Sequence, residues 1–168
     1  MSFNPFAWPF RAQYLLGALL CAALLGYALY AQHVMFLDPC PLCIFQRVAF
    51  MVLGAVFLLG AIHGPKSAGG RRAYGVLAAL AAAGGMAVAG RHVWLQSLPA
   101  DEVPACGPGL EYMLEAFPLR EVLVRVFSGS GECAEVDWTF LGLSMPAWTL
   151  IWFMALGTAA LWAGFRRR

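Results

Sequence analysis

The sequence predicts an all-α membrane protein, in which four transmembrane helices form one bundle. Of the 168 residues, 61% are hydrophobic and only 12% are charged, about half the charged fraction of a typical soluble domain. Four apolar segments, at about residues 14–31, 44–62, 73–90 and 146–165, are each long enough to cross a bilayer as a helix, which takes about 17–25 residues. Residues 1–168 are therefore expected to form a single integral membrane domain.

Charge placement orients the four predicted helices. Seven of the eleven Lys and Arg residues lie before the first segment, between the second and third, or after the fourth, and all nine acidic residues lie in the other two connections. The positive-inside rule counts the basic residues and places both termini in the cytoplasm. The loops at about residues 32–43 and 91–145 are therefore expected outside, where disulfides persist. A net charge of +2 without a basic stripe argues against nucleic-acid binding.

The first outer loop carries Cys40 and Cys43 immediately before the second apolar segment. Pro41 suits the first turn of a helix, where its missing N–H costs nothing. The positive end of such a helix stabilises a thiolate, so this Cys-x-x-Cys is a redox arrangement. Arg47 then lies one turn below Cys43 on the same face. A charge at this depth predicts a role, although simple extension of the side chain to the membrane surface would also explain it.

The second outer loop is longer and begins with an extended segment at residues 98–108, where three prolines flank Cys106. Apolar residues at helical spacing follow on both sides of Pro118. They predict a short amphipathic helix, which lies on the membrane surface or packs on the end of the bundle. A Gly-Ser run at residues 128–131 then predicts a hinge before Cys133, which suits a cysteine that changes partners.

Four of the five cysteines belong to the outer loops, namely Cys40, Cys43, Cys106 and Cys133. They predict two disulfides, with Cys21 as a small apolar side chain packed in the membrane. The alternative is a zinc site. It is disfavoured because Cys106 and Cys133 stand 27 positions apart, and because neither His33 nor His92 shows the spacing of a metal ligand. No metal is therefore expected.

Two disulfides on one face of a membrane protein permit electron transfer by thiol–disulfide exchange, which requires a final electron acceptor. No haem, flavin or iron–sulfur motif occurs in the sequence. A lipid-soluble quinone that reaches the outer helix ends is the expected acceptor. Arg47, beside Cys43, would stabilise both a thiolate and a reduced quinone oxygen.

Taken together, several motifs resemble the disulfide bond formation protein B (DsbB) family of bacterial inner membranes. They are Gln32-His33-Val34-Met35, Pro39-Cys40-Pro41-Leu42-Cys43, Arg47, Gly131-Glu132-Cys133-Ala134-Glu135, Trp138, Phe140-Leu141-Gly142-Leu143 and Met145-Pro146. The resemblance covers almost the whole chain. It implies a multi-pass inner-membrane protein with two periplasmic loops that reoxidises a DsbA-type thiol oxidase. The electrons would pass to ubiquinone or menaquinone, held without a covalent bond.

The resemblance also implies roles for the four loop cysteines. Cys106 would form the mixed disulfide with the DsbA-type partner, and Cys133 would be its intramolecular partner. Cys133 would then attack Cys40 and release Cys43 as the thiolate that reacts with the quinone. In the resting protein, Cys40–Cys43 and Cys106–Cys133 disulfides are expected.

Two further positions match the family's quinone site. Arg47 matches an arginine that supports quinone binding, and His92 matches a histidine near the same site. Gln46 departs from the pattern, since some members carry an acidic residue there. Two other functions stay open: a quinone reductase of the vitamin K epoxide reductase type, and a membrane scaffold whose outer loops are stiffened by disulfides or zinc.

Overall fold

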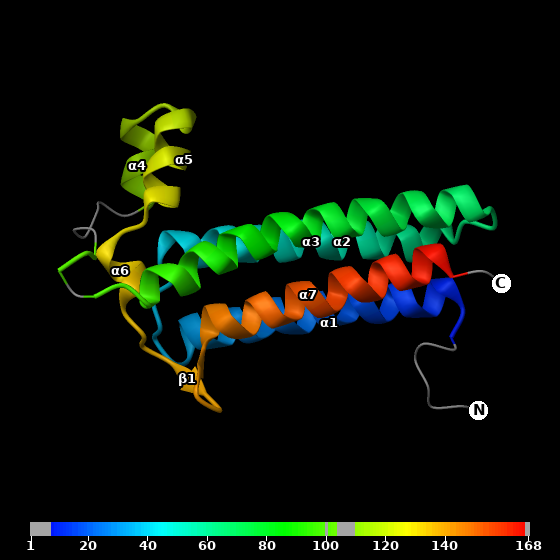
Figure 1. The fold of residues 1–168 in the computed structure, drawn as a ribbon, viewed down its shortest axis with the longest axis horizontal. Helices are drawn as coiled ribbons and strands as arrows, with labels where there is room; N and C mark the ends of the chain where they lie inside the picture. The colour runs from blue at the N-terminus through cyan, green and yellow to red at the C-terminus, as the bar shows by residue number, and fades with distance from the viewer. Residues whose placement is uncertain (1–7, 100, 104–109, 167–168) are drawn as a thin grey trace.

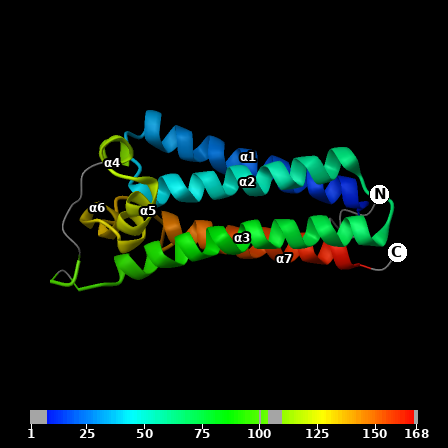
Figure 2. The ribbon, with the colours of Figure 1, turned by 90° about the horizontal axis from the view of Figure 1, so that it is seen from above.

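The computed structural model describes residues 8–99, 101–103 and 110–166. Its long helices are α1 (Phe10–His33), α2 (Pro41–His63), α3 (Ala68–Gln96) and α7 (Met145–Phe165). They run side by side (Figures 1 and 2), and each is long and apolar enough to cross a membrane. The predicted fold class is confirmed. The start of α1, the end of α7 and the α2–α3 connection share one end of the bundle, and the segments between α3 and α7 share the other (Figure 1).

Every long helix extends beyond its predicted segment, and α3 extends furthest, to Gln96 instead of residue 90. Residues 91–96, which the sequence analysis placed in the second outer loop, are therefore the last turns of α3. Residues 91–96 stay helical because they anchor the outer segments. The Arg91 guanidinium donates to the carbonyl oxygens of Phe127 (2.9 Å) and Ser128 (3.0 Å), and the Gln96 amide donates to that of Glu135 (3.3 Å). The apolar segment ended at about residue 90 because residues 91–96 include the polar side chains Arg91, His92 and Gln96.

Aromatic rings and small residues fill the interior of the bundle. Phe50 of α2 and Phe153 of α7 stack with their ring centroids 4.0 Å apart. Small residues let α3 and α7 approach closely, since a Cβ added at Gly164 would lie 2.8 Å from the carbonyl oxygen of Arg71. Close packing of this kind holds membrane helices together where lipid removes the hydrophobic driving force.

Gly85 and Gly84 of α3 provide a matched test of this packing. A Cβ at Gly85 would lie 2.4 Å from the Phe153 ring, whereas a Cβ at Gly84 would meet no atom within 4 Å. Phe153 is fully buried and stacked on Phe50, so it has little room to move. We expect Gly85→Ala to lower the free energy of unfolding by about 1–3 kcal/mol, and Gly84→Ala not to lower it. Denaturation in detergent measures both, and equal destabilisation would contradict the packing.

The outer end is built from α4 (Leu110–Ala116), α5 (Leu119–Ser128), α6 (Gly131–Ala134), β1 (Thr139–Phe140) and β2 (Leu143–Ser144). The predicted amphipathic helix is in fact two helices, because Pro118 ends one and caps the next. Their inner face packs in one cluster with Leu42 and Leu95 at the end of the bundle, through Met113, Val122 and Val126. The sequence left open whether this segment lies on the membrane surface or packs on the end of the bundle, and the structure shows it packed on the end of the bundle. Both helices run across the bundle axis (Figure 1).

The segment predicted to be a hinge is closely fitted to the bundle. Gly129 has a φ of +87°, which favours glycine. A Cβ there would also lie 2.5 Å from a methyl group of Leu95. Gly131 is buried at the start of α6. The glycines therefore allow the chain to pass close to α3 and place Cys133 beside the bundle.

Candidate functional site

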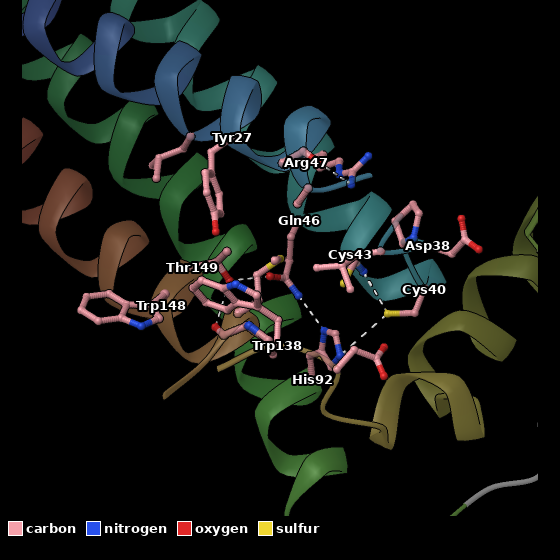
Figure 3. A pocket seen from close by; sticks show the side chains of 18 of the residues that line it. Tyr27, Asp38, Cys40, Cys43, Gln46, Arg47, His92, Trp138, Trp148 and Thr149 are labelled. Carbon is pink, nitrogen blue, oxygen red and sulfur yellow. Dashed lines mark hydrogen bonds between the residues drawn. The ribbon is translucent and has the colours of Figure 1, made fainter. Parts of the chain in front are cut away.

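The outer ends of α1, α2, α3 and α7 enclose a cavity of about 230 Å³ (Figure 3). Leu24 and Leu25 of α1, Phe50 of α2 and Trp152 of α7 give it apolar walls. Near its outer rim, Trp138 lies edge-on to Tyr27, with 6.0 Å between the ring centroids. Six of the polar side chains that line it come from the long helices and the start of α2: Cys40, Cys43, Gln46, Arg47, His92 and Thr149. A mostly apolar cavity with a few convergent polar groups is typical of a small-molecule site.

Cys40 and Cys43 take the positions that the sequence predicts. Cys40 is the N-cap of α2, Pro41 begins the helix, and the Cys40 sulfur accepts a hydrogen bond from the Cys43 backbone N–H at 3.4 Å. Cys40 is 9% exposed, and Cys43 is half-buried on the cavity wall. Both sulfurs therefore lie at the positive end of the α2 dipole, which favours negative charge on them.

Cys133 reaches the same place from α6. It is fully buried, and its sulfur lies 3.6 Å from the Ser130 hydroxyl. Interaction with the nearby Cys40 side chain and then burial raise the pKa of the Cys133 thiol above its ordinary value. The sulfurs of Cys133 and Cys40 are thus already adjacent, as disulfide exchange requires.

The remaining cysteines are placed as follows. Cys21 is buried inside the bundle against Gly54, away from the other sulfurs, as expected for a packing residue. Cys106 lies outside the described residues. The four cysteines that the structure describes are free thiols, so the two disulfides stay predictions.

A buried hydrogen-bonded chain connects Cys40 to α7. Gln46 and His92, 3% and 1% exposed, are the buried polar side chains in the part of the chain that the structure describes, and they contact each other. His92 Nδ1 lies 2.9 Å from the Gln46 amide nitrogen, and His92 Nε2 lies 3.8 Å from Cys40 Sγ. The Thr149 hydroxyl bonds to the Gln46 amide oxygen and, at 2.9 Å, to the Pro146 carbonyl. Figure 3 shows the hydrogen bonds that join Cys40, His92, Gln46 and Thr149.

This arrangement determines which ring nitrogen of His92 carries the proton. When the Gln46 amide donates to Nδ1, the neutral ring carries its proton on Nε2, the nitrogen that faces Cys40. His92 then donates to the Cys40 sulfur and stabilises a thiolate there. The sequence pointed to His92 but not to this function, and Thr149 carried no local signal at all. Three helices must pack together before these residues meet.

Arg47 is fastened to α1. Its guanidinium donates to the Gln32 side-chain oxygen and, at 3.1 Å, to the Ala28 carbonyl. The side chain is half-buried and lines the same cavity as Cys43 (Figure 3). These two contacts hold the positive charge between α1 and α2, at the wall of the cavity.

The fold and the site define a helical membrane protein with a Cys-x-x-Cys pair of free thiols at one end of a four-helix bundle. Residues 10–163 match the sequence profile of the family described as disulfide bond formation protein DsbB. The chain is 56% identical over 165 residues to disulfide bond formation protein B of Xanthomonas campestris pv. campestris (strain 8004), covering 98% of this chain and 96% of that protein. It is 57% identical over 153 residues to the protein of the same name from Hahella chejuensis, covering 91% of each.

This protein therefore belongs to the DsbB family, and the resemblance noted in the sequence is confirmed. It is a membrane oxidoreductase of disulfide bond formation.

Proposed function

We propose that this protein is a quinone-dependent thiol oxidase of the bacterial inner membrane, which reoxidises a periplasmic DsbA-type dithiol oxidase. The observation that carries the proposal is a continuous row of sulfurs. The Cys133 thiol lies beside Cys40, the Cys40 sulfur accepts a hydrogen bond from the Cys43 backbone N–H, and Cys43 lies on the wall of a largely apolar cavity between membrane-crossing helices. Such a row connects exchange with a soluble protein to an acceptor dissolved in the membrane.

The proposed relay consists of disulfide exchanges. A thiolate of the reduced partner attacks Cys106, and Cys133 leaves as a thiolate. Cys133 attacks the Cys40 sulfur, the Cys40–Cys43 bond breaks, and the electron pair stays on Cys43. The second thiol of the partner then releases Cys106.

Reoxidation completes the cycle. The Cys106 thiolate would attack Cys133, form the Cys106–Cys133 disulfide again and release Cys40 as a thiolate. Cys40 and Cys43 would then form their disulfide and give two electrons to quinone in the cavity. The sum is one partner disulfide formed and one quinone reduced with two protons.

The cavity residues support a quinone as the electron acceptor. Its apolar walls suit an uncharged ring, and Arg47 holds a positive charge on the side where Cys43 lies. Oxygens of the reduced ring carry developing negative charge, which a guanidinium stabilises. Ubiquinone and menaquinone both meet this description, and neither needs a covalent bond to the protein.

The fold supports the proposed orientation, with both termini in the cytoplasm. One end of the bundle carries the start of α1, the end of α7 and the α2–α3 connection (Figure 1), and with them Arg11, Lys66, Arg71 and Arg72. Cys40, Cys43 and Cys133 lie at the opposite end. On this orientation the sulfurs face the periplasm, whose oxidising conditions preserve disulfides.

One experiment tests function and orientation together. Reduced DsbA-type protein, which cannot cross a membrane, is added to right-side-out spheroplasts that carry this chain as their only such oxidase. We expect oxidation of the partner with one quinone reduced per disulfide, loss of both in Cys43→Ser, and normal rates in Cys21→Ser. Oxidation without quinone, or only in inverted vesicles, would contradict the proposal. A scaffold protein would give no turnover.

A further inference from the structure

We propose that Cys40 and Cys43, in their reduced form, and His92 make up a binding site for a soft divalent cation such as Zn²⁺. The ligand atoms of these three residues all lie within 4.8 Å of one another, and Cys40 Sγ lies 3.8 Å from His92 Nε2. Tetrahedral zinc with ordinary bond lengths separates sulfur from nitrogen by about 3.5 Å and sulfur from sulfur by about 3.8 Å. The three groups need only small side-chain rotations to reach this geometry.

The surroundings of His92 are those of a metal ligand. A ligating histidine donates its second ring N–H to a hydrogen-bond acceptor, which fixes the tautomer. Nδ1 of His92 already faces the Gln46 amide. If that amide turns over, its oxygen accepts from Nδ1–H, and Nε2 is left with a lone pair directed at the two sulfurs.

Thr149 accommodates both amide orientations. Its hydroxyl donates to the Gln46 oxygen in one orientation. In the other it accepts from the Gln46 nitrogen and donates to the Pro146 carbonyl, which lies at 2.9 Å. His92, Gln46 and Thr149 therefore keep their hydrogen-bond partners whether His92 donates to a thiolate or ligates a metal.

The electrostatics of the cavity favour a cation. Four acidic residues line it against one arginine: Asp38, Glu132, Glu135 and Asp137 against Arg47. All four carboxylates are exposed and so attract a hydrated ion to the opening. Cys133 falls outside the set of mutually close ligand atoms, so water supplies the fourth ligand.

Binding is linked to the redox state of the pair. The cation displaces the proton from each thiol and holds both sulfurs as thiolates, whereas the disulfide form offers it only His92. A bound cation therefore blocks re-formation of the Cys40–Cys43 disulfide. This inhibition rests on the proposed function, but cation binding does not.

Anaerobic titration of the reduced, full-length protein with Co²⁺ tests the site. One equivalent should give thiolate-to-cobalt charge-transfer bands and the intense visible bands of a tetrahedral ion, and Zn²⁺ should displace it. His92→Ala should lower the affinity at least tenfold, and Gln46→Ala about 10–100-fold through the orientation of His92. Gln96→Ala is the matched control, because Gln96 lines the same cavity one turn further along α3 but bonds to Glu135 and Ser144 instead. Its affinity should equal that of the unaltered protein.

The outcomes separate the parts of the inference. Equal binding by the oxidised protein, or unchanged affinity in both His92→Ala and Gln46→Ala, overturns the three-residue site and leaves at most a bare dithiol. Zn²⁺ should also slow quinone reduction by the reduced enzyme, and a chelator should restore it. Binding without inhibition overturns the inhibitory effect alone, whereas absence of quinone reduction before any metal is added would contradict the proposed function.

Discussion

Replacing Cys133 with alanine is expected to reduce turnover to background and to leave Cys106 joined to the partner in a mixed disulfide. In this variant Cys106 is a free thiol, so the partner is added in its disulfide form. Cys106 attacks that disulfide, and no Cys133 thiol is present to take Cys106 back. Cys133 is also the thiol that contacts Cys40, so its loss removes the only sulfur in the described structure that bridges the outer loop to the α2 pair.

The surroundings of Cys133 favour its proposed attack on Cys40. Interaction with the Cys40 side chain and then burial raise the pKa of this thiol, which means that its thiolate is less stable here than in water. When Cys133 leaves Cys106 as a thiolate, it is therefore a strong nucleophile directly beside its target. Transfer of the electron pair to Cys43, at the N-terminal end of α2, moves the charge to a site that stabilises it.

Non-reducing gels followed by mass spectrometry of the trapped complex measure the expected species. Cys21→Ala serves as the control, because Cys21 is buried in the bundle away from the relay, and it should neither trap the partner nor slow turnover. A mixed disulfide that passed through Cys43 instead of Cys106 would mean that the relay runs in the opposite direction.

The features that the sequence predicted correctly are local in origin. Apolar length marks the four membrane helices, and Pro41 marks the start of α2 between its two cysteines. The spacing of apolar residues around Pro118 likewise predicted one short amphipathic helix, where the structure has the two helices α4 and α5. Each of these signals depends on residues within a few turns of one another.

The features that were missed depend on packing between helices. The resemblance pointed to His92, but its contacts with Cys40 and Gln46 were missed, because His92 lies 49 positions after Cys43 and no local spacing connects them. Thr149 reaches Gln46 only because α7 packs beside α2 and α3. The extension of α3 to Gln96 was missed for a related reason, since its last residues make polar contacts with the end of α5 and with Glu135, far along the chain.

The second large effect is expected from Arg47→Ala, which should raise the quinone concentration needed for half-maximal turnover at least tenfold, or about 1.4 kcal/mol of binding free energy. The substitution removes the positive charge at the cavity beside Cys43. A thiolate held against an electron-poor quinone ring should also give a visible charge-transfer band when Cys133 is bonded to Cys40. Loss of the Arg47 charge should weaken that band.

Matched variants separate this charge from the contacts that Arg47 makes with α1. Arg47→Lys keeps a cation but lacks the forked donors that reach Gln32 and Ala28 together. Gln32→Ala keeps the arginine and removes one of its two acceptors. If charge decides quinone binding, Arg47→Lys and Gln32→Ala should both retain most of the band and of the affinity. If Arg47→Ala kept normal quinone dependence, Arg47 would serve only to fasten α1 to α2. The acceptor would then have to bind nearer His92, the next residue to substitute.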